Sequence, residues 1–142
     1  MTPAAHRTWG IVATVVVAAA VAYGFYIVGS PESRRTERLD DHRLEHLKAI
    51  VYETRDLVYD AEDKVMKRAL FASLEELQAA ARRRRITIAD PATGKPYGYE
   101  VVDEHRFQIC AEFDGRRDED WAVLWNHEPG RRCWIIDVRD EP

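Results

Sequence analysis

A run of 19 residues without any charge, at positions 10–28, constrains this chain more than any other feature. As an α-helix rising 1.5 Å per residue, the run is about 28 Å long, which matches the hydrocarbon core of a bilayer. Trp9 lies at one end and Tyr23 and Tyr26 at the other, as in the aromatic belts of membrane helices. The sequence therefore predicts a transmembrane helix over residues 10–28, after a tail of residues 1–9.

A cleaved signal peptide is the competing interpretation of this run. Ala20, Val21 and Ala22 have the small-x-small pattern of a cleavage site. The apolar residues continue past that point to Val28, however, and Arg7 is the only charged side chain before the run. We therefore expect an uncleaved membrane anchor.

The rest of the 142-residue chain is charged and has room for one domain. About 110 residues can build one modest core but not two, which excludes a multi-pass transporter or a large enzyme. The net charge is −4, and residues 86–142 hold 13 acidic and 7 basic side chains, so no nucleic acid is expected as a partner. The expected partners are the lipid bilayer and other membrane-protein helices or a larger membrane complex, with no cofactor.

Two helices are predicted after a linker at residues 29–35. Gly29 ends the membrane helix, and Ser30 and Pro31 suit the cap and first position of the next. This second helix, called the spine helix here, extends to about Tyr59. One face carries apolar residues and the rest carries charges: Leu44, Leu47, Ile50, Val51, Leu57 and Val58 against Arg43, Glu45, Lys48, Glu53 and Arg55.

A shorter helix is predicted to begin near Ser73, where Ser73 and Glu76 form a capping box. It ends in the four arginines of residues 82–85. Such a run can mark a nucleic-acid or anionic-lipid patch, but cations at a helix end are favoured by the helix dipole, and a solvated helix end is the preferred interpretation.

From residue 86 the apolar period changes to two, which indicates strands. Strands are predicted at 86–88, 97–101, 107–113, 121–125 and 133–138, with a Pro- and Gly-rich turn at 90–96 and a charged loop at 114–120. The predicted class is α+β: a transmembrane helix, then a spine helix packed on a small antiparallel sheet over residues 36–138, then a tail of residues 139–142.

This plan resembles that of type IV pilins and type II secretion pseudopilins. Leu44, Leu47, Ile50 and Tyr59 are similar to the pilin spine helix, and residues 70–77 resemble the pseudopilin L-P-x-S-L-x-x-L step. Residues 90–99 resemble the D-P-x-G-x-P-Y-x-Y segment that opens the pilin sheet. Residues 107–113 and 125–134 are similar to motifs of uncharacterised bacterial single-span, membrane-anchored proteins.

The chain also departs from the pilin pattern. It lacks a prepilin leader, its membrane run has no glutamate, and Phe71 stands where the step has a proline. The resemblance therefore implies a pilin-like fold and a bacterial inner-membrane location, without processing by prepilin peptidase or incorporation into a pilus.

The orientation in the membrane rests on two opposed signals. Basic residues after the run, at 34, 35, 38, 43 and 48, outnumber the single Arg7 before it, which by the positive-inside rule favours an internal domain. The cysteine pair and the pilin resemblance favour the opposite side. We expect the soluble domain to be periplasmic.

Cys110 and Cys133 form the candidate disulfide. In the strand 107–113 the apolar residues are odd-numbered, and in the strand 133–138 they are even-numbered, so both cysteines point away from the apolar face. Neighbouring antiparallel strands would then bring the sulfurs within bonding range. Free thiols, and a metal site completed by His127, remain as alternatives.

Two other groups have the residue types of metal sites. His42, Glu45 and His46 match the H-x-x-E-H pattern of inverted zinc proteases, in which two histidines hold zinc and the glutamate activates water. Carboxylates of the loop 114–120 could bind calcium, although EF-hand spacing is absent: Asp114, Asp118, Glu119 and Asp120. A solvated face and a solvated loop are the preferred interpretations, so no metal or catalytic residue is assigned.

A stripe of small residues gives the membrane helix its candidate interface. Gly10, Thr14, Ala18 and Ala22 recur every four residues and so share one side of a helix, where small side chains let a second membrane helix approach closely. The sequence thus favours a non-enzymatic membrane-anchored protein that acts by protein–protein interaction. The alternatives are an accessory subunit of a respiratory or photosynthetic membrane complex, and a small zinc hydrolase.

Overall fold

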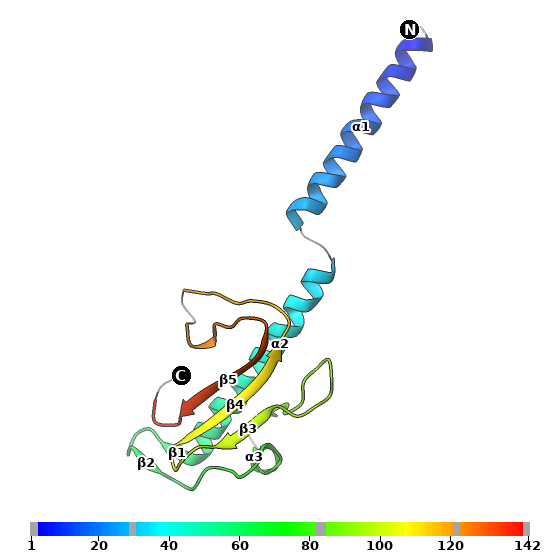
Figure 1. Cartoon of the computed structure of the whole chain (residues 1–142). Coiled ribbons are helices and arrows are strands. Elements are labelled where there is room, and N and C mark those ends of the chain that lie inside the picture. Colours follow the sequence, from blue (N-terminus) through cyan, green and yellow to red (C-terminus); the bar gives the residue numbers. More distant parts are fainter. Residues whose placement is uncertain (1–2, 29–30, 82–84, 121–122, 141–142) are drawn as a thin grey trace. The chain divides into compact units, whose positions relative to one another are not determined.

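The computed structural model describes residues 3–28, 31–81, 85–120 and 123–140 (Figure 1). The chain divides into two compact units, residues 1–35 and residues 36–142. The structure is α+β, with an apolar helix near the N-terminus and small antiparallel sheets in the second unit.

The first unit consists mainly of α1 (Pro3–Val28), a helix of 26 residues. Pro3 suits its first position, where the missing N–H has no partner to lose. Within residues 7–27 an 18-residue stretch has a mean hydropathy of 2.1, and α1 is long and apolar enough to cross a membrane. The helix begins seven residues before the uncharged run, so the predicted tail of residues 1–9 is helical from Pro3.

The spine helix is α2 (Pro31–Val58), with 28 residues. It starts with the predicted proline and ends one residue before Tyr59, as expected. In the second unit its buried apolar residues are Leu44, Leu47, Ile50, Val51 and Val58. Two charged residues assigned to the polar side, Arg43 and Glu53, are instead buried, which corrects the predicted pattern of this helix.

A small hairpin that the sequence analysis missed follows α2. It pairs β1 (Tyr59–Asp60) with β2 (Val65–Met66). Asp60 Oδ1 accepts hydrogen bonds from the amides of Glu62 and Asp63, and Lys64 adopts a positive φ of 54°. Strands of two residues are too short to show an alternating pattern, and this explains the omission.

The next helix, α3 (Leu74–Ala80), begins where the capping box predicts. Ser73 Oγ accepts a hydrogen bond from the Glu76 amide, and Glu76 Oε2 accepts one from the Ala72 amide, one residue before the cap. The helix ends at Ala80, earlier than expected. Of the arginine run, residues 82–84 lie outside the described residues.

Three strands form the main sheet, in the order β3 (Gly98–Val101), β4 (Arg106–Phe113) and β5 (Gly130–Asp137), all antiparallel. Two strand predictions were wrong. Residues 86–88 lie beside the turn with only an isolated bridge between Ala89 and Pro96. Residues 123–125 form a 3₁₀ helix, η1 (Val123–Trp125), while 121 and 122 lie outside the described residues.

The sheet lies against α2, and the two share one hydrophobic core (Figure 1). Inward residues alternate as predicted, odd-numbered in β4 and even-numbered from Trp134 to Val138. α3 adds Leu74 and Leu77. The largest fully buried apolar side chains of the core come from α2, α3, β4 and the residue after β5: Phe107, Phe113, Leu47, Ile50, Leu77, Ile109, Val51, Val58 and Val138.

Candidate functional site

The surface of α1 is the most unusual surface of the molecule. Every large apolar side chain from Trp9 to Ile27 is exposed. An apolar surface that runs round a whole helix is unfavourable in water and is typical of a helix buried in lipid or among other helices. The apolar surface of α1 is therefore the first candidate for a functional surface.

The small-residue stripe lies entirely within α1. Thr14 Oγ1 donates a hydrogen bond of 2.9 Å to the carbonyl oxygen of Gly10, so its hydroxyl is satisfied within the helix. A Cβ at Gly10 would meet nothing within 4 Å. The stripe is thus a side of the helix with short side chains: Gly10, Thr14, Ala18 and Ala22. Its one hydroxyl, that of Thr14, needs no hydrogen bond from lipid or from a partner.

The two cysteines are joined by a disulfide, as predicted. Cys110 and Cys133 are direct partners across β4 and β5, with Cα atoms 4.0 Å apart and an S–S bond of 2.03 Å. Gly98 faces Cys110 from β3, where a Cβ would lie 3.0 Å from the Cys110 Cβ. The bond uses both sulfurs, which removes the free-thiol and metal alternatives for this pair.

His127 lies in the core, away from the disulfide. Its ring stacks on Phe113 with centroids 3.8 Å apart, and Trp134 meets it edge-on. Burial lowers the pKa of His127, and the nearby Arg117 charge lowers it further, against the opposing effect of Asp40. His127 is therefore a neutral core residue at pH 7 and does not complete a site with Cys110 and Cys133.

The predicted zinc motif is divided between two environments. His42 Nδ1 lies 3.5 Å from Glu45 Oε2, and both side chains are exposed. His46 Nδ1 instead lies 2.9 Å from the Tyr97 hydroxyl, and burial, followed by the His42 charge, lowers the pKa of His46. Within the described residues no group of three His, Cys, Asp or Glu side chains is placed to hold a metal ion.

Carboxylates of the acidic loop 114–120 form ion pairs with arginines. Asp114 pairs with Arg43, Asp118 with Arg116, and Glu119 with Arg117. Carboxylates committed to separate guanidinium groups do not converge on one point. The geometry therefore favours the solvated, ion-paired loop over a calcium site.

A buried charge cluster, which the sequence analysis missed, surrounds Arg43. Its Nη1 donates to Asp40 and Asp114 at 2.7 Å, and its Nε donates to Asp90 at 2.5 Å. Burial alone would lower the pKa of Arg43, but the hydrogen bonds to the three carboxylates raise it above its usual value. The cluster joins α2, the 90–96 turn and the end of β4.

One sequence signal could have found this cluster. Asp40 and Arg43 lie three residues apart, and Arg43 is four residues before Leu47, on the core-facing side of the helix. A charge on the apolar face of a helix predicts a buried partner, since buried charges are paired. Its partners Asp90 and Asp114 are distant in sequence, and no local pattern identifies them.

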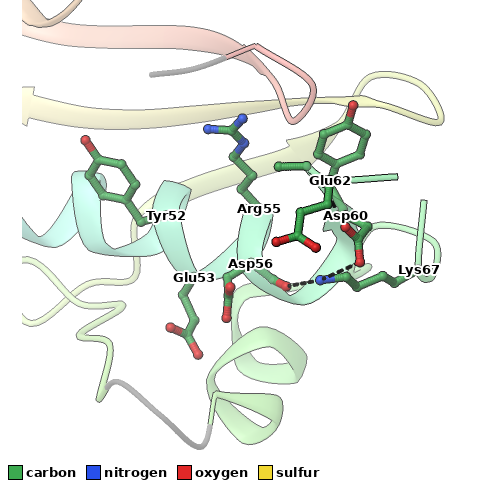
Figure 2. A pocket seen from close by; sticks show the side chains of 9 residues that line it. Tyr52, Glu53, Arg55, Asp56, Asp60, Glu62 and Lys67 are labelled. Carbon is green, nitrogen blue, oxygen red and sulfur yellow. Dashed lines mark hydrogen bonds and ion pairs between the residues drawn. The ribbon is translucent and has the colours of Figure 1, made fainter. Parts of the chain in front are cut away.

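A groove of about 850 Å³ lies beside the C-terminal half of α2 and the β1–β2 hairpin (Figure 2). Lys67 Nζ donates to the Asp56 carbonyl oxygen at 3.4 Å and lies 3.6 Å from Asp60 Oδ2. Figure 2 shows Tyr52 and Arg55 on one side of α2, and Glu53 on the other. Glu53 Oε1 is buried and accepts no hydrogen bond from the described residues. The contacts of Lys67 hold the hairpin against the C-terminal end of α2, so the role of Lys67 is structural.

Comparison with known proteins adds no relative: no protein-family model, no curated protein and no solved structure matches the chain. The chain's own functional features are the apolar surface of α1, the Cys110–Cys133 disulfide and the Arg43 cluster.

Proposed function

We propose that this protein is a single-span, pilin-like protein of the bacterial envelope that acts through protein–protein interaction and not as an enzyme. The exposed apolar surface of α1 carries the proposal, since residues 7–27 are long and apolar enough to cross a bilayer. Lipid, or the helices of other membrane proteins, is the environment in which such a surface is stable.

The pilin-like part of the proposal is supported by the order of the elements. An apolar helix, a spine helix and an antiparallel meander follow one another, and α2 shares a core with the sheet. The zinc-hydrolase alternative receives no support from the position of His46, whose Nδ1 is engaged by Tyr97.

The disulfide supports placing the second unit on the periplasmic side of the inner membrane. Disulfides form and persist in oxidising compartments, of which the bacterial periplasm is one. The arginines at positions 34, 35 and 38 favour the opposite orientation, but loop charge is a statistical preference, whereas a reducing cytoplasm would break the Cys110–Cys133 bond. We therefore place the domain outside the cytoplasm.

Extraction of membranes at alkaline pH tests the anchoring. The full chain should remain in the membrane pellet and retain peptides from the first turns of α1. Val16→Glu places a charge in the middle of the apolar segment and should release the protein, whereas Val16→Leu should leave it in the pellet. Release of the unaltered chain, or a product cleaved after Ala22, would contradict the proposal.

Co-purification in mild detergent tests the interaction. Thr14→Leu with Ala18→Leu fills the small-residue stripe and should abolish recovery of a membrane partner, while Val12→Leu with Val16→Leu, elsewhere on α1, should not. Recovery of a respiratory or photosynthetic complex would favour the accessory-subunit alternative. Equal recovery with both double variants would reduce α1 to a tether.

A further inference from the structure

The two ends of the disulfide differ in their surroundings. Cys110 is 4% exposed, whereas Cys133 is an exposed residue. Cys110 lies on β4, the central strand of the sheet, and Cys133 lies on β5, which is an edge strand of that sheet (Figure 1). A molecule approaching along the S–S axis from outside the sheet therefore meets Cys133 first.

Polar groups gather at the buried sulfur. Gln108 Nε2 donates a hydrogen bond of 3.2 Å to Cys110 Sγ. Arg131 Nη2 and Cys110 Sγ lie 3.4 and 3.6 Å from the point where a Cβ at Gly98 would sit. The guanidinium and the sulfur thus share the space that the glycine leaves open, which places them within about 7 Å of each other.

This asymmetry matches what thiol–disulfide exchange requires. A thiolate attacks one sulfur in line with the S–S bond, and the other sulfur leaves as a thiolate. Hydrogen-bond donors and a nearby arginine stabilise a thiolate and so make it a better leaving group. In this domain Gln108 donates to Cys110 Sγ and Arg131 lies within about 7 Å of it, while Cys133 is the more exposed of the two cysteines.

We propose that Cys133 Sγ is an exchange site for an external dithiol, with Cys110 as the leaving sulfur. One thiolate of the dithiol bonds to Cys133 Sγ, the S–S bond breaks, and its electron pair goes to Cys110 Sγ beside Gln108 and Arg131. The second thiolate of the dithiol then attacks its own sulfur in the mixed disulfide and displaces the Cys133 thiolate. Both cysteines take up protons and are reduced, and the dithiol is oxidised to its disulfide.

Reduced glutathione is the probe for the first step, because a monothiol has no second sulfur of its own with which to resolve the mixed disulfide, so an early quench traps the adduct. The full-length protein in detergent micelles is treated at pH 8 and quenched with acid, and free thiols are then alkylated and mapped by mass spectrometry. Glutathione should be found on Cys133 and the alkyl group on Cys110. Glutathione on Cys110, or no adduct on the folded protein, would overturn the proposal.

Variants of Gln108 and Arg131 test how the leaving sulfur of Cys110 is stabilised. Gln108→Leu and Arg131→Met should each slow adduct formation by about threefold to tenfold. Arg132→Met is the matched control, because it removes the same charge one residue along β5, where Arg132 Nε bonds the Glu128 carbonyl oxygen instead. Equal rates in all three variants would overturn the assignment of Cys110 as the leaving sulfur. Unchanged circular dichroism shows that each variant is folded.

Discussion

Arg43 is the residue on which the buried charge of the domain depends. Its side chain is 5% exposed and contacts carboxylates from three segments that are far apart in the sequence. Asp40 in turn accepts hydrogen bonds from the amides of Asp114 and Gly115. Asp90 accepts hydrogen bonds from Arg43 and from the amides of its own turn, and Asp40 accepts them from Arg43 and from the 114–115 amides. The cluster therefore fixes the 90–96 turn and the 114–115 segment against α2.

Replacing Arg43 with methionine should destabilise the domain strongly. Asp40 and Asp90 would remain buried without their cation, and removal of one partner of a buried ion pair typically costs about 3–5 kcal/mol. Arg106→Met breaks an exposed pair with Asp103 and should cost less than about 1 kcal/mol. Urea unfolding of the full chain in detergent measures both. Similar losses in the two variants would contradict a special role for Arg43.

Buried His127 and half-buried His46 should make the domain less stable in mild acid. Burial lowers the pKa of His127 and of His46, whereas an unfolded histidine titrates near pH 6.5. Below that pH the unfolded chain binds more protons than the folded one, so the free energy of unfolding falls as the pH falls. The aspartates with lowered pKa, Asp60, Asp90, Asp103 and Asp137, contribute only below about pH 4, when the unfolded carboxylates become protonated.

Urea unfolding between pH 7.5 and pH 5 measures this dependence. The unfolding free energy of the unaltered protein should decrease steadily across that range. In the His127→Gln protein the decrease should be smaller, because one of the two histidines with a lowered pKa no longer titrates. A steeper decrease in the variant would show that His127 is protonated in the folded domain, contrary to this account.

At the scale of elements, local patterns predicted what local interactions determine. The uncharged run, Pro31 and the Ser73–Glu76 box located the helices, because capping and periodicity are properties of neighbouring residues. Odd and even parity located the two cysteines on one face of the sheet and so predicted their bond. Residues 86–88 look like a strand for the same local reason, but only the bridge from Ala89 to Pro96 forms beside them.

The features that were missed depend on contacts between distant residues. Nothing near Arg43 in the sequence indicates that Asp90 and Asp114 lie beside it. The pairing of Arg43 with Asp114 and of Arg117 with Asp41 is a result of the fold, and it determines that the 114–120 loop is ion-paired. A cluster of carboxylates in the sequence is therefore weak evidence for a metal site until the partners of each carboxylate are known.

Removing the disulfide should lower the free energy of unfolding of the domain without abolishing the fold. The bond joins residues 23 apart, and closing a loop of that length typically adds about 3 kcal/mol through the unfolded state. The double variant Cys110→Ala with Cys133→Ala should lose about that amount in urea unfolding. A loss below about 1 kcal/mol would mean that the unfolded chain is not restricted by the bond.

At the scale of the whole molecule, the division into two units separates the two parts of the functional argument. Residues 1–35 carry α1, which is long and apolar enough to cross a membrane. Residues 36–142 have a core of their own and the disulfide, a bond that persists in oxidising compartments. Both features support the proposal of an inner-membrane protein with its domain outside the cytoplasm.

Protease digestion of intact spheroplasts distinguishes the two orientations of the domain. A tag at the N-terminus and a second tag at the C-terminus report the two ends separately, and a cytoplasmic protein serves as the control for lysis. The protease should remove the C-terminal tag and the domain, while the N-terminal tag remains protected with the membrane span. Complete protection of the domain in intact spheroplasts, with digestion only after lysis, would contradict an external domain. The arginine-rich segment that follows α1 would then lie in the cytoplasm.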